Sequence, residues 1–131
     1  MNDKEYEKLK SRIKKYVDKW LPMLGLKWWT VSLYYEREKC STKSVVDDGN
    51  MTGMDIGAKT YIQYPYKTAQ VYFYLPGMEG LDSAGIDRLV LHEFIHILTE
   101  EIKDSNVDHN HCERGVSDLT DAFLWTYKRV K

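Results

Sequence analysis

The chain has 131 residues, of which 43% are hydrophobic and 30% are charged, and its formal net charge is -1 at pH 7. This length suits one domain with a sizeable core and is too short for two ordinary domains, so we expect a single domain over residues 1–131. The near-neutral charge gives no reason to expect nucleic acid as a partner, and no apolar run approaches the roughly 18 residues of a membrane span.

The cysteines and the N-terminus indicate a cellular compartment. Cys40 and Cys112 are too few for a disulfide framework, which favours a reducing environment. The N-terminus is charged from Asp3 and Lys4 onward, unlike a signal peptide. We therefore expect a cytoplasmic protein that does not associate with membranes.

A first helix is predicted at the N-terminus. Asn2 followed by Glu5 is a capping-box pattern, and Pro22 and Gly25 mark the end of the segment. Between them, apolar residues recur at helical spacing: Tyr6, Leu9, Ile13, Tyr16, Val17, Trp20 and Leu24. The opposite face is rich in lysine, which we interpret as a solvated helix surface.

Three segments in the middle of the chain have the alternating pattern of half-buried strands. They are residues 28–36, 54–62 and 69–75, and the polar stretch 37–50 reads as a loop or a weak hairpin arm. We expect them to form a small antiparallel sheet. The many tyrosines in this region could stack on single-stranded nucleic acid, but no basic residues are interleaved closely enough to follow a phosphate backbone. Covering the sheet surface is the more natural role for them.

Two further helices are predicted in the C-terminal half. Asp82 or Ser83 can cap the first of them, which contains the apolar run 86–98. The second covers residues 110–131 and has apolar positions at helical spacing. The expected fold class is therefore α+β, with a small antiparallel sheet packed on three helices.

The sharpest chemical signal is the H-E-x-x-H pattern of His92, Glu93 and His96. Residues four apart on a helix lie on the same face, so both imidazoles can bind one ion. Glu93 is rotated by roughly 100° from His92, where it can hold a water molecule without binding the metal. Two ligands and a base at this spacing predict a Zn²⁺ site and peptide hydrolysis.

The apolar surroundings of the motif support a metal. Aliphatic residues and Phe94 flank the three polar residues on nearly every side, which indicates a helix that is buried all round. Buried polar groups without partners cost roughly several kcal/mol, and a metal ion is the simplest partner for two histidines and a glutamate.

A third ligand must come from another segment. The metzincin pattern is excluded because Thr99 and Ile102 occupy the positions of its glycine and third histidine. Glu113 falls on the apolar face of the last helix and would point inward, so it completes a His₂Glu set. His109 is the alternative if that helix begins earlier, and Cys112 is a weaker one.

The same elements suggest a family. The residues concerned are 28–33, with two tryptophans, the hairpin arm 69–73, the motif segment 91–98, and 113–119, which begins with Glu113. In this order they resemble the small zincin-like metallopeptidases of bacteriophages and prophages. The resemblance spans nearly the whole chain, and H-E-x-x-H is its specific motif.

This resemblance implies a zincin-like fold with the metal site on the second helix. It implies that His92 and His96 are zinc ligands, that Glu93 is the general base and that Glu113 is the downstream ligand. It also implies that the strand 70–75 is the sheet edge that receives an extended peptide.

The expected function is thus a zinc peptidase acting on a peptide or protein substrate. Two alternatives remain. In the first, the protein is a non-catalytic binding or regulatory protein in which zinc only stabilises the scaffold, as four protein ligands would indicate. In the second, it is a nucleic-acid adaptor that uses the basic first helix, as steep salt dependence of binding would indicate.

Overall fold

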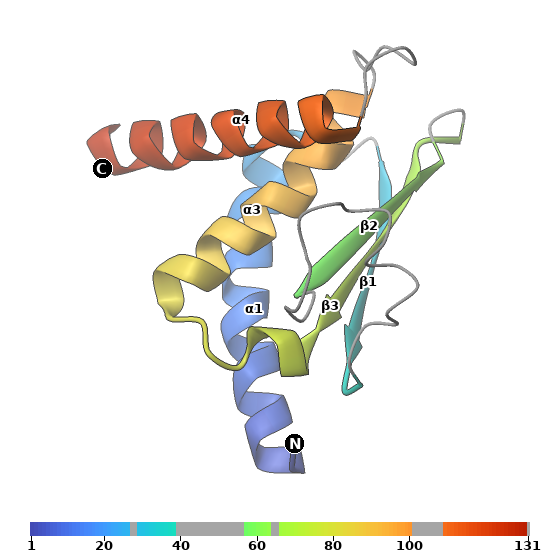
Figure 1. Ribbon diagram of the computed structural model, residues 1–131, viewed down its shortest axis with the longest axis vertical. Coiled ribbons are helices and arrows are strands. Elements are labelled where there is room, and N and C mark those ends of the chain that lie inside the picture. Colours follow the sequence, from blue (N-terminus) through green and yellow to red (C-terminus); the bar gives the residue numbers. More distant parts are fainter. Residues whose placement is uncertain (27–28, 39–56, 64–65, 101–108, 131) are drawn as a thin grey trace.

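The described part of the chain folds into three α-helices and a three-stranded sheet, so the α+β class is confirmed (Figure 1). The computed structural model describes residues 1–26, 29–38, 57–63, 66–100 and 109–130, without the side chains of 109–112, 129 and 130. The helices are α1 (Asp3–Met23), α3 (Ser83–Thr99) and α4 (His109–Val130). The strands are β1 (Thr30–Glu36), β2 (Ala58–Gln63) and β3 (Thr68–Tyr74), and a 3-10 helix, η4 (Leu75–Met78), follows β3.

Helix α1 begins and ends for local reasons. The Asn2 side chain accepts a hydrogen bond from the Glu5 backbone N–H, and the Glu5 side chain accepts one from the Asn2 backbone, as the capping box predicts. Pro22 lies inside the last turn, and Gly25, not Pro22, marks the end. Its φ of 70° is a left-handed conformation that costs glycine little and commonly follows a helix.

The sheet has the order β1-β3-β2 and is mixed. Strands β2 and β3 are antiparallel, as predicted, but β1 pairs with β3 in parallel, with Leu33 opposite Val71. The expectation of a wholly antiparallel sheet was therefore wrong. A parallel pair needs a long crossover connection, and the chain between β1 and β3 is long enough because it includes β2.

The central place of β3 overturns a second expectation. Residues 70–75 were expected to form the sheet edge that receives a substrate, but β3 has a partner strand on each side. Among the described strands, β1 and β2 are the outer ones. Strand β3 is buried because it is central in the sheet. Three of its residues, Ala69, Val71 and Phe73, are each at most 2% exposed.

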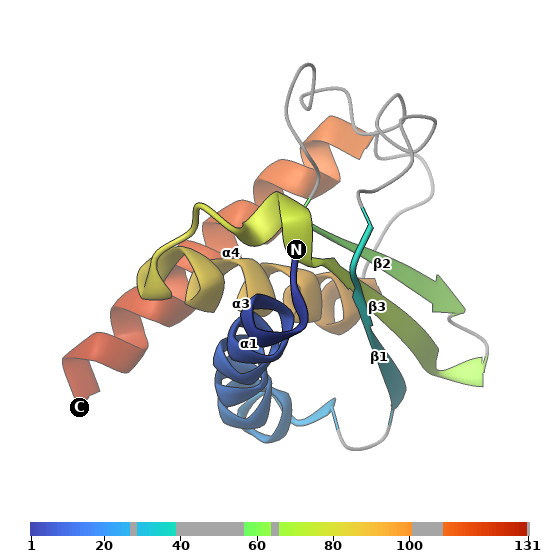
Figure 2. The ribbon, with the colours of Figure 1, turned by 90° about the horizontal axis from the view of Figure 1, so that it is seen from below.

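All three helices lie on the same face of the sheet, which separates an inner from an outer sheet face (Figure 2). Helix α3 is the centre of the helical layer and contacts α1, α4 and β2. Its residues Ile86, Val90, Phe94 and Ile97 are fully buried, whereas Leu98 is 38% exposed. The helix is therefore buried on most of its surface but not all round.

A polar contact joins α1 to α3. Asp87 accepts a hydrogen bond from the Trp20 indole N–H and pairs with the Lys19 ammonium at 3.1 Å. The same ammonium lies 4.2 Å from the ring centroid of Tyr127 on α4. Three helices thus meet at one carboxylate and one cation.

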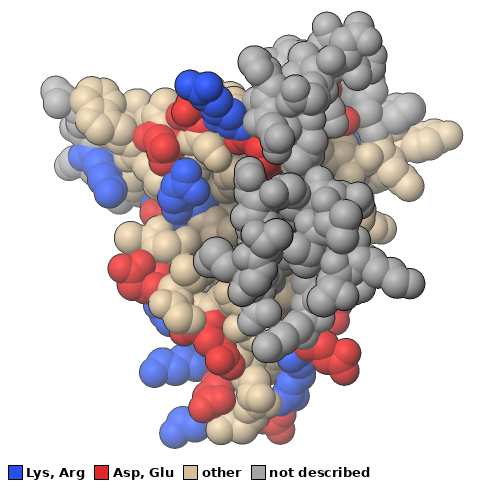
Figure 3. All heavy atoms as spheres, viewed as in Figure 1, with Lys and Arg blue, Asp and Glu red and all other residues tan. Residues whose placement is uncertain are grey.

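The surface offers two general observations. On the face shown in Figure 3, positive and negative side chains are interspersed over the part of the chain that is described. None of the helices within the described ranges has the combined length and apolarity needed to cross a membrane.

Candidate metal centre

The candidate centre starts from helix α3, whose N-terminus is fixed by Asp82. The Asp82 side chain accepts a hydrogen bond from the Gly85 backbone N–H at 2.8 Å, which caps the helix. Ten residues further on, the helical repeat brings His92 and His96 to the same side. Their ring centroids are 4.9 Å apart with an edge-on orientation, so the two imidazoles border one space.

Glu113 brings the third group from helix α4. One carboxylate oxygen lies 2.8 Å from His92 Nε2, and the other lies 3.0 Å from His96 Nε2. Val116 and Thr120, on the same side of α4, are buried at 3% and 0% exposure. The apolar face of α4 thus turns Glu113 inward, and the structure brings together the three side chains that the sequence analysis selected as ligands.

The donor set fits a zinc ion. Two imidazole nitrogens and one carboxylate are the His₂Glu set of catalytic zinc sites. With bonds of about 2.0–2.1 Å and tetrahedral geometry, neighbouring ligand atoms lie about 3.3 Å apart. The contacts of 2.8 and 3.0 Å join each imidazole to a different oxygen of Glu113, so the three groups lie near this spacing as hydrogen-bonded partners.

The electrostatics of Glu113 suit a ligand. Burial raises the pKa of its carboxyl group, but hydrogen bonds from His92 and His96 and the positive charge of these rings lower it by more in total. The pKa therefore lies well below its usual range. The carboxylate therefore stays ionised, whereas an imidazole that donates to it from Nε2 must release that proton before the same nitrogen binds a cation.

Glu93 lies beside these groups, but its carboxylate is hydrogen-bonded to a strand of the sheet. It is only 6% exposed, and its carboxylate is within 4.8 Å of a ring nitrogen of both histidines. The hydroxyl of Thr60 on strand β2 donates a hydrogen bond to Glu93 Oε1 at 2.7 Å. The carboxylate is thus held toward the sheet, next to the space between the imidazoles.

The second ring nitrogen of His92 stands out. Nδ1 is buried and has no hydrogen-bond partner within the part of the chain that the structure describes. Histidines that bind metals usually donate their other N–H to a carboxylate, a carbonyl or a water molecule. The donor set that includes His92 Nε2 therefore fits zinc. The acceptor that usually holds the Nδ1–H of a metal-binding histidine is not found among the described residues.

The other candidate ligands are distributed as follows. The side chains of His109 and Cys112 lie outside the described residues, although both positions belong to α4. Asp118, another acidic residue of α4, is exposed. Glu113 is thus the alternative whose carboxylate the structure places at the histidines.

Thr60 was not among the residues that the sequence pattern predicted for the site. The alternation in 54–62 put this residue on the inner side of its strand, between Ala58 and Ile62. A polar residue at an inward position of a strand needs a partner, and that was the available signal. The identity of this partner, Glu93, depends on how β2 packs on α3. The alternation of residues along a strand gives no information on that packing.

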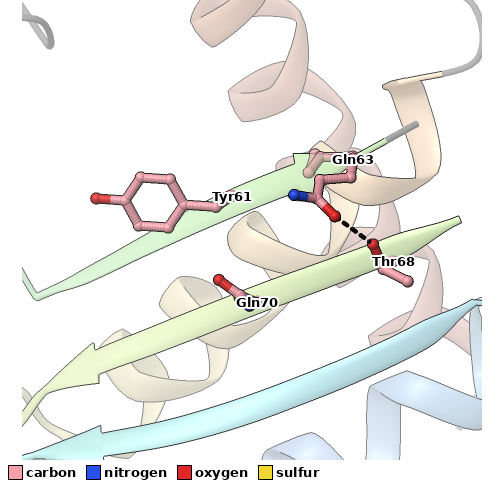
Figure 4. Close-up of a pocket in the computed structure, with 5 residues that line it drawn as sticks. Tyr61, Gln63, Thr68 and Gln70 are labelled. Carbon is pink, nitrogen blue, oxygen red and sulfur yellow. Dashed lines mark hydrogen bonds between the residues drawn. The ribbon is translucent and has the colours of Figure 1, made fainter. Parts of the chain in front are cut away.

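A pocket of about 260 Å³ lies elsewhere on the sheet, between strands β2 and β3, and is lined by Tyr61, Ile62, Gln63, Thr68 and Gln70. Figure 4 shows Tyr61 and Gln63 on β2 beside Thr68 and Gln70 on β3, with a hydrogen bond from Thr68 to Gln63. Tyr61 is adjacent in sequence to Thr60 but points to the opposite face. The pocket and the candidate metal centre are therefore on different sides of the sheet.

Comparisons of the chain with models of known protein families, with curated proteins and with solved structures found no match. The resemblance to zincin-like metallopeptidases thus stays a prediction from the sequence.

Proposed function

We propose that this chain is a zinc-dependent peptidase in which His92, His96 and Glu113 hold the metal and Glu93 is the general base. The observation that supports this proposal most is the convergence of three ligand groups from two helices. Glu113 meets His92 at 2.8 Å and His96 at 3.0 Å. Glu93 lies on the same helix as the two histidines, and its carboxylate is within 4.8 Å of a ring nitrogen of each.

The chemistry follows from these positions. A zinc ion bound there would supply Lewis acidity, which polarises a carbonyl and lowers the pKa of a water ligand to about 7. Glu93 accepts a proton from the attacking water and delivers it to the amine that leaves when the C–N bond breaks. The 6% exposure of Glu93 keeps bulk water away from this proton transfer.

The substrate is a peptide or protein segment in extended form. Strand β2 is an outer strand of the described sheet, and its residue Thr60 touches Glu93. An extended segment that pairs with β2 would therefore pass close to the base, which is the β-augmentation mode of recognition. Strand β2, and not residues 70–75, is therefore the proposed sheet edge that receives an extended peptide.

The first test is the zinc content of the purified, untagged protein. We expect about one zinc per chain in the wild type and in Glu93→Gln, and a large loss in His96→Ala and Glu113→Ala, because a catalytic site holds its metal with three protein ligands. Asp118→Ala is the matched control, since Asp118 is an exposed acid on the same helix as Glu113. It should keep the zinc of the wild type.

The second test is cleavage of unfolded casein by the zinc-loaded protein. Glu93→Gln should lower the rate by roughly 100-fold or more while zinc stays bound, since a positioned general base contributes about that much. Absence of zinc from the folded wild type would refute the proposal. Zinc that is lost in Glu93→Gln would instead make Glu93 a fourth ligand and favour the non-catalytic, zinc-stabilised alternative.

A further inference from the structure

The contact between Thr60 and Glu93 connects the sheet to the helix that carries the base. Thr60 lies on the inner side of β2, opposite Val71 of β3 in the antiparallel register. Its hydroxyl is 2.7 Å from Glu93 Oε1 and 3.5 Å from the backbone carbonyl oxygen of Glu93. The donor therefore meets both the side chain and the main chain of the same residue.

The position of this hydroxyl is firmly determined. Threonine is branched at Cβ, so few rotamers are open to it in a strand. Its strand is bonded to β3, which is the central and most buried strand of the sheet. Glutamate, in contrast, loses considerable side-chain freedom when it is fixed. The rigid partner in this pair is Thr60, and the residue that becomes ordered is Glu93.

We propose that Thr60 is a positioning residue that holds the Glu93 carboxylate beside the metal centre and away from the metal itself. This inference rests on the proposed function, because it assigns to Glu93 the role of base. A carboxylate within 4.8 Å of both imidazoles can swing onto an ion that they bind. The hydrogen bond from Thr60 opposes this movement, so that Glu93 faces a bound water or ligand.

The test uses acetohydroxamic acid, which binds to protein-bound zinc and loses a proton to a neighbouring carboxylate. Its affinity therefore depends both on the metal and on the position of Glu93, and needs no known substrate. Zinc affinity is measured first by competition with a chelator, and acetohydroxamate affinity is then measured by calorimetry on the zinc-loaded protein. Glu93→Gln gives the affinity that remains without the base.

We expect Thr60→Val to weaken acetohydroxamate binding by about fivefold or more, because it removes one hydrogen bond to a charged group. Its zinc affinity should not fall, because the three ligands are untouched, and a Glu93 carboxylate that swings onto the ion would raise it. Thr60→Ser keeps the hydroxyl and should restore the wild-type affinity. The matched control is Thr68→Val on the neighbouring strand, whose hydroxyl donates to Gln63 on the outer face.

The outcomes separate the two proposals. If the wild type binds zinc and acetohydroxamate but Thr60→Val binds both equally well, Thr60 has no positioning role and the proposed function stands. If the zinc-loaded wild type binds acetohydroxamate no better than Glu93→Gln, Glu93 does not face the metal, and the role of Thr60 is refuted. If the wild type binds no zinc, the proposed function fails and the inference fails with it.

Folding is checked on the same variants. Circular dichroism and thermal unfolding of the metal-free proteins show whether Thr60→Val keeps the native structure. Should it not fold, Thr60→Ala removes the hydroxyl with a smaller side chain and carries the same expectation for acetohydroxamate and zinc.

Discussion

Glu113 joins two helices through the imidazoles of His92 and His96. Its carboxylate is part of the contact between α4 and α3 even without a metal, because its two oxygens meet the two imidazoles of α3 at 2.8 and 3.0 Å. Its role in the metal-free protein can therefore be measured separately from zinc binding. The lowered pKa of Glu113 makes this role depend on pH.

We expect Glu113→Gln to destabilise the metal-free protein by about 2 kcal/mol near neutral pH, because hydrogen bonds to a charged group are lost. The folded-state pKa of Glu113 is lower than the unfolded value of about 4.3, so its contribution is complete above that value and decreases as the pH falls below it. Urea unfolding of both proteins between pH 3 and 8 measures the difference.

The control for this prediction is Asp118→Asn, which changes an exposed carboxylate on the same helix. Its effect should stay within about 0.5 kcal/mol at every pH, as is usual for surface substitutions. A difference between wild type and Glu113→Gln that does not shrink in acid would show that the charge of Glu113 does not support the packing of the two helices.

At the scale of elements, the candidate centre depends on how α3 is held. Asp87 binds α3 to α1 through Trp20 and Lys19, and the ammonium of Lys19 reaches Tyr127 on α4. The side chains of Asp87 and Lys19 are only 15% and 21% exposed. Removal of one partner from such a contact leaves a poorly hydrated charge behind.

Asp87→Ala is therefore expected to lower the free energy of unfolding by about 2 kcal/mol or more, since it leaves both the ammonium and the indole N–H without this acceptor. Asp121→Ala is the matched comparison. Asp121 pairs with Arg88 between α3 and α4 at 3.2 Å, but its side chain is 64% exposed, so its loss should cost less than about 0.5 kcal/mol. Equal effects in urea unfolding would contradict this distinction between buried and exposed pairs.

At the scale of the whole molecule, the arrangement of the strands decides which of them borders the candidate centre. Strands β1 and β2 lie on opposite sides of β3. Of these two outer strands, β2 is the one that packs on α3. The parallel register of β1 and β3 places Ser32 opposite Gln70. A disulfide between these two positions would report on that register directly.

We expect Ser32→Cys combined with Gln70→Cys to form a disulfide on oxidation, in a background with Cys40 and Cys112 replaced by serine. Adjacent strands bring facing residues within the roughly 4.4–6.8 Å between Cα atoms that a disulfide allows. Ser32→Cys with Gln63→Cys is the control, because Gln63 lies across β3 and should not form a bond. Thiol titration and mass spectrometry distinguish the two, and the opposite result would rule out the observed strand order.

Local patterns in the sequence predicted the elements and selected the candidate ligands. Capping residues, alternation and helical spacing are local properties, so they predicted α1, β1, β3 and the two C-terminal helices close to their observed bounds. The strand expected over 54–62 is observed over Ala58–Gln63, and residues 54–56 lie outside the described part of the chain. The spacing of His92 and His96 and the inward face of Glu113 are also set by helix geometry, which explains why the sequence selected side chains that the structure brings together.

The tertiary structure decided the pairing of the strands and the contacts across elements. A strand pattern says which face of a strand is buried but not which strand is its neighbour or in which direction that strand runs, so the parallel pair and the central place of β3 were not predicted. For the same reason the sequence could not show that Thr60 meets Glu93 or that Lys19 and Trp20 meet Asp87. These contacts join residues far apart in the chain, and their formation depends on the packing of whole elements.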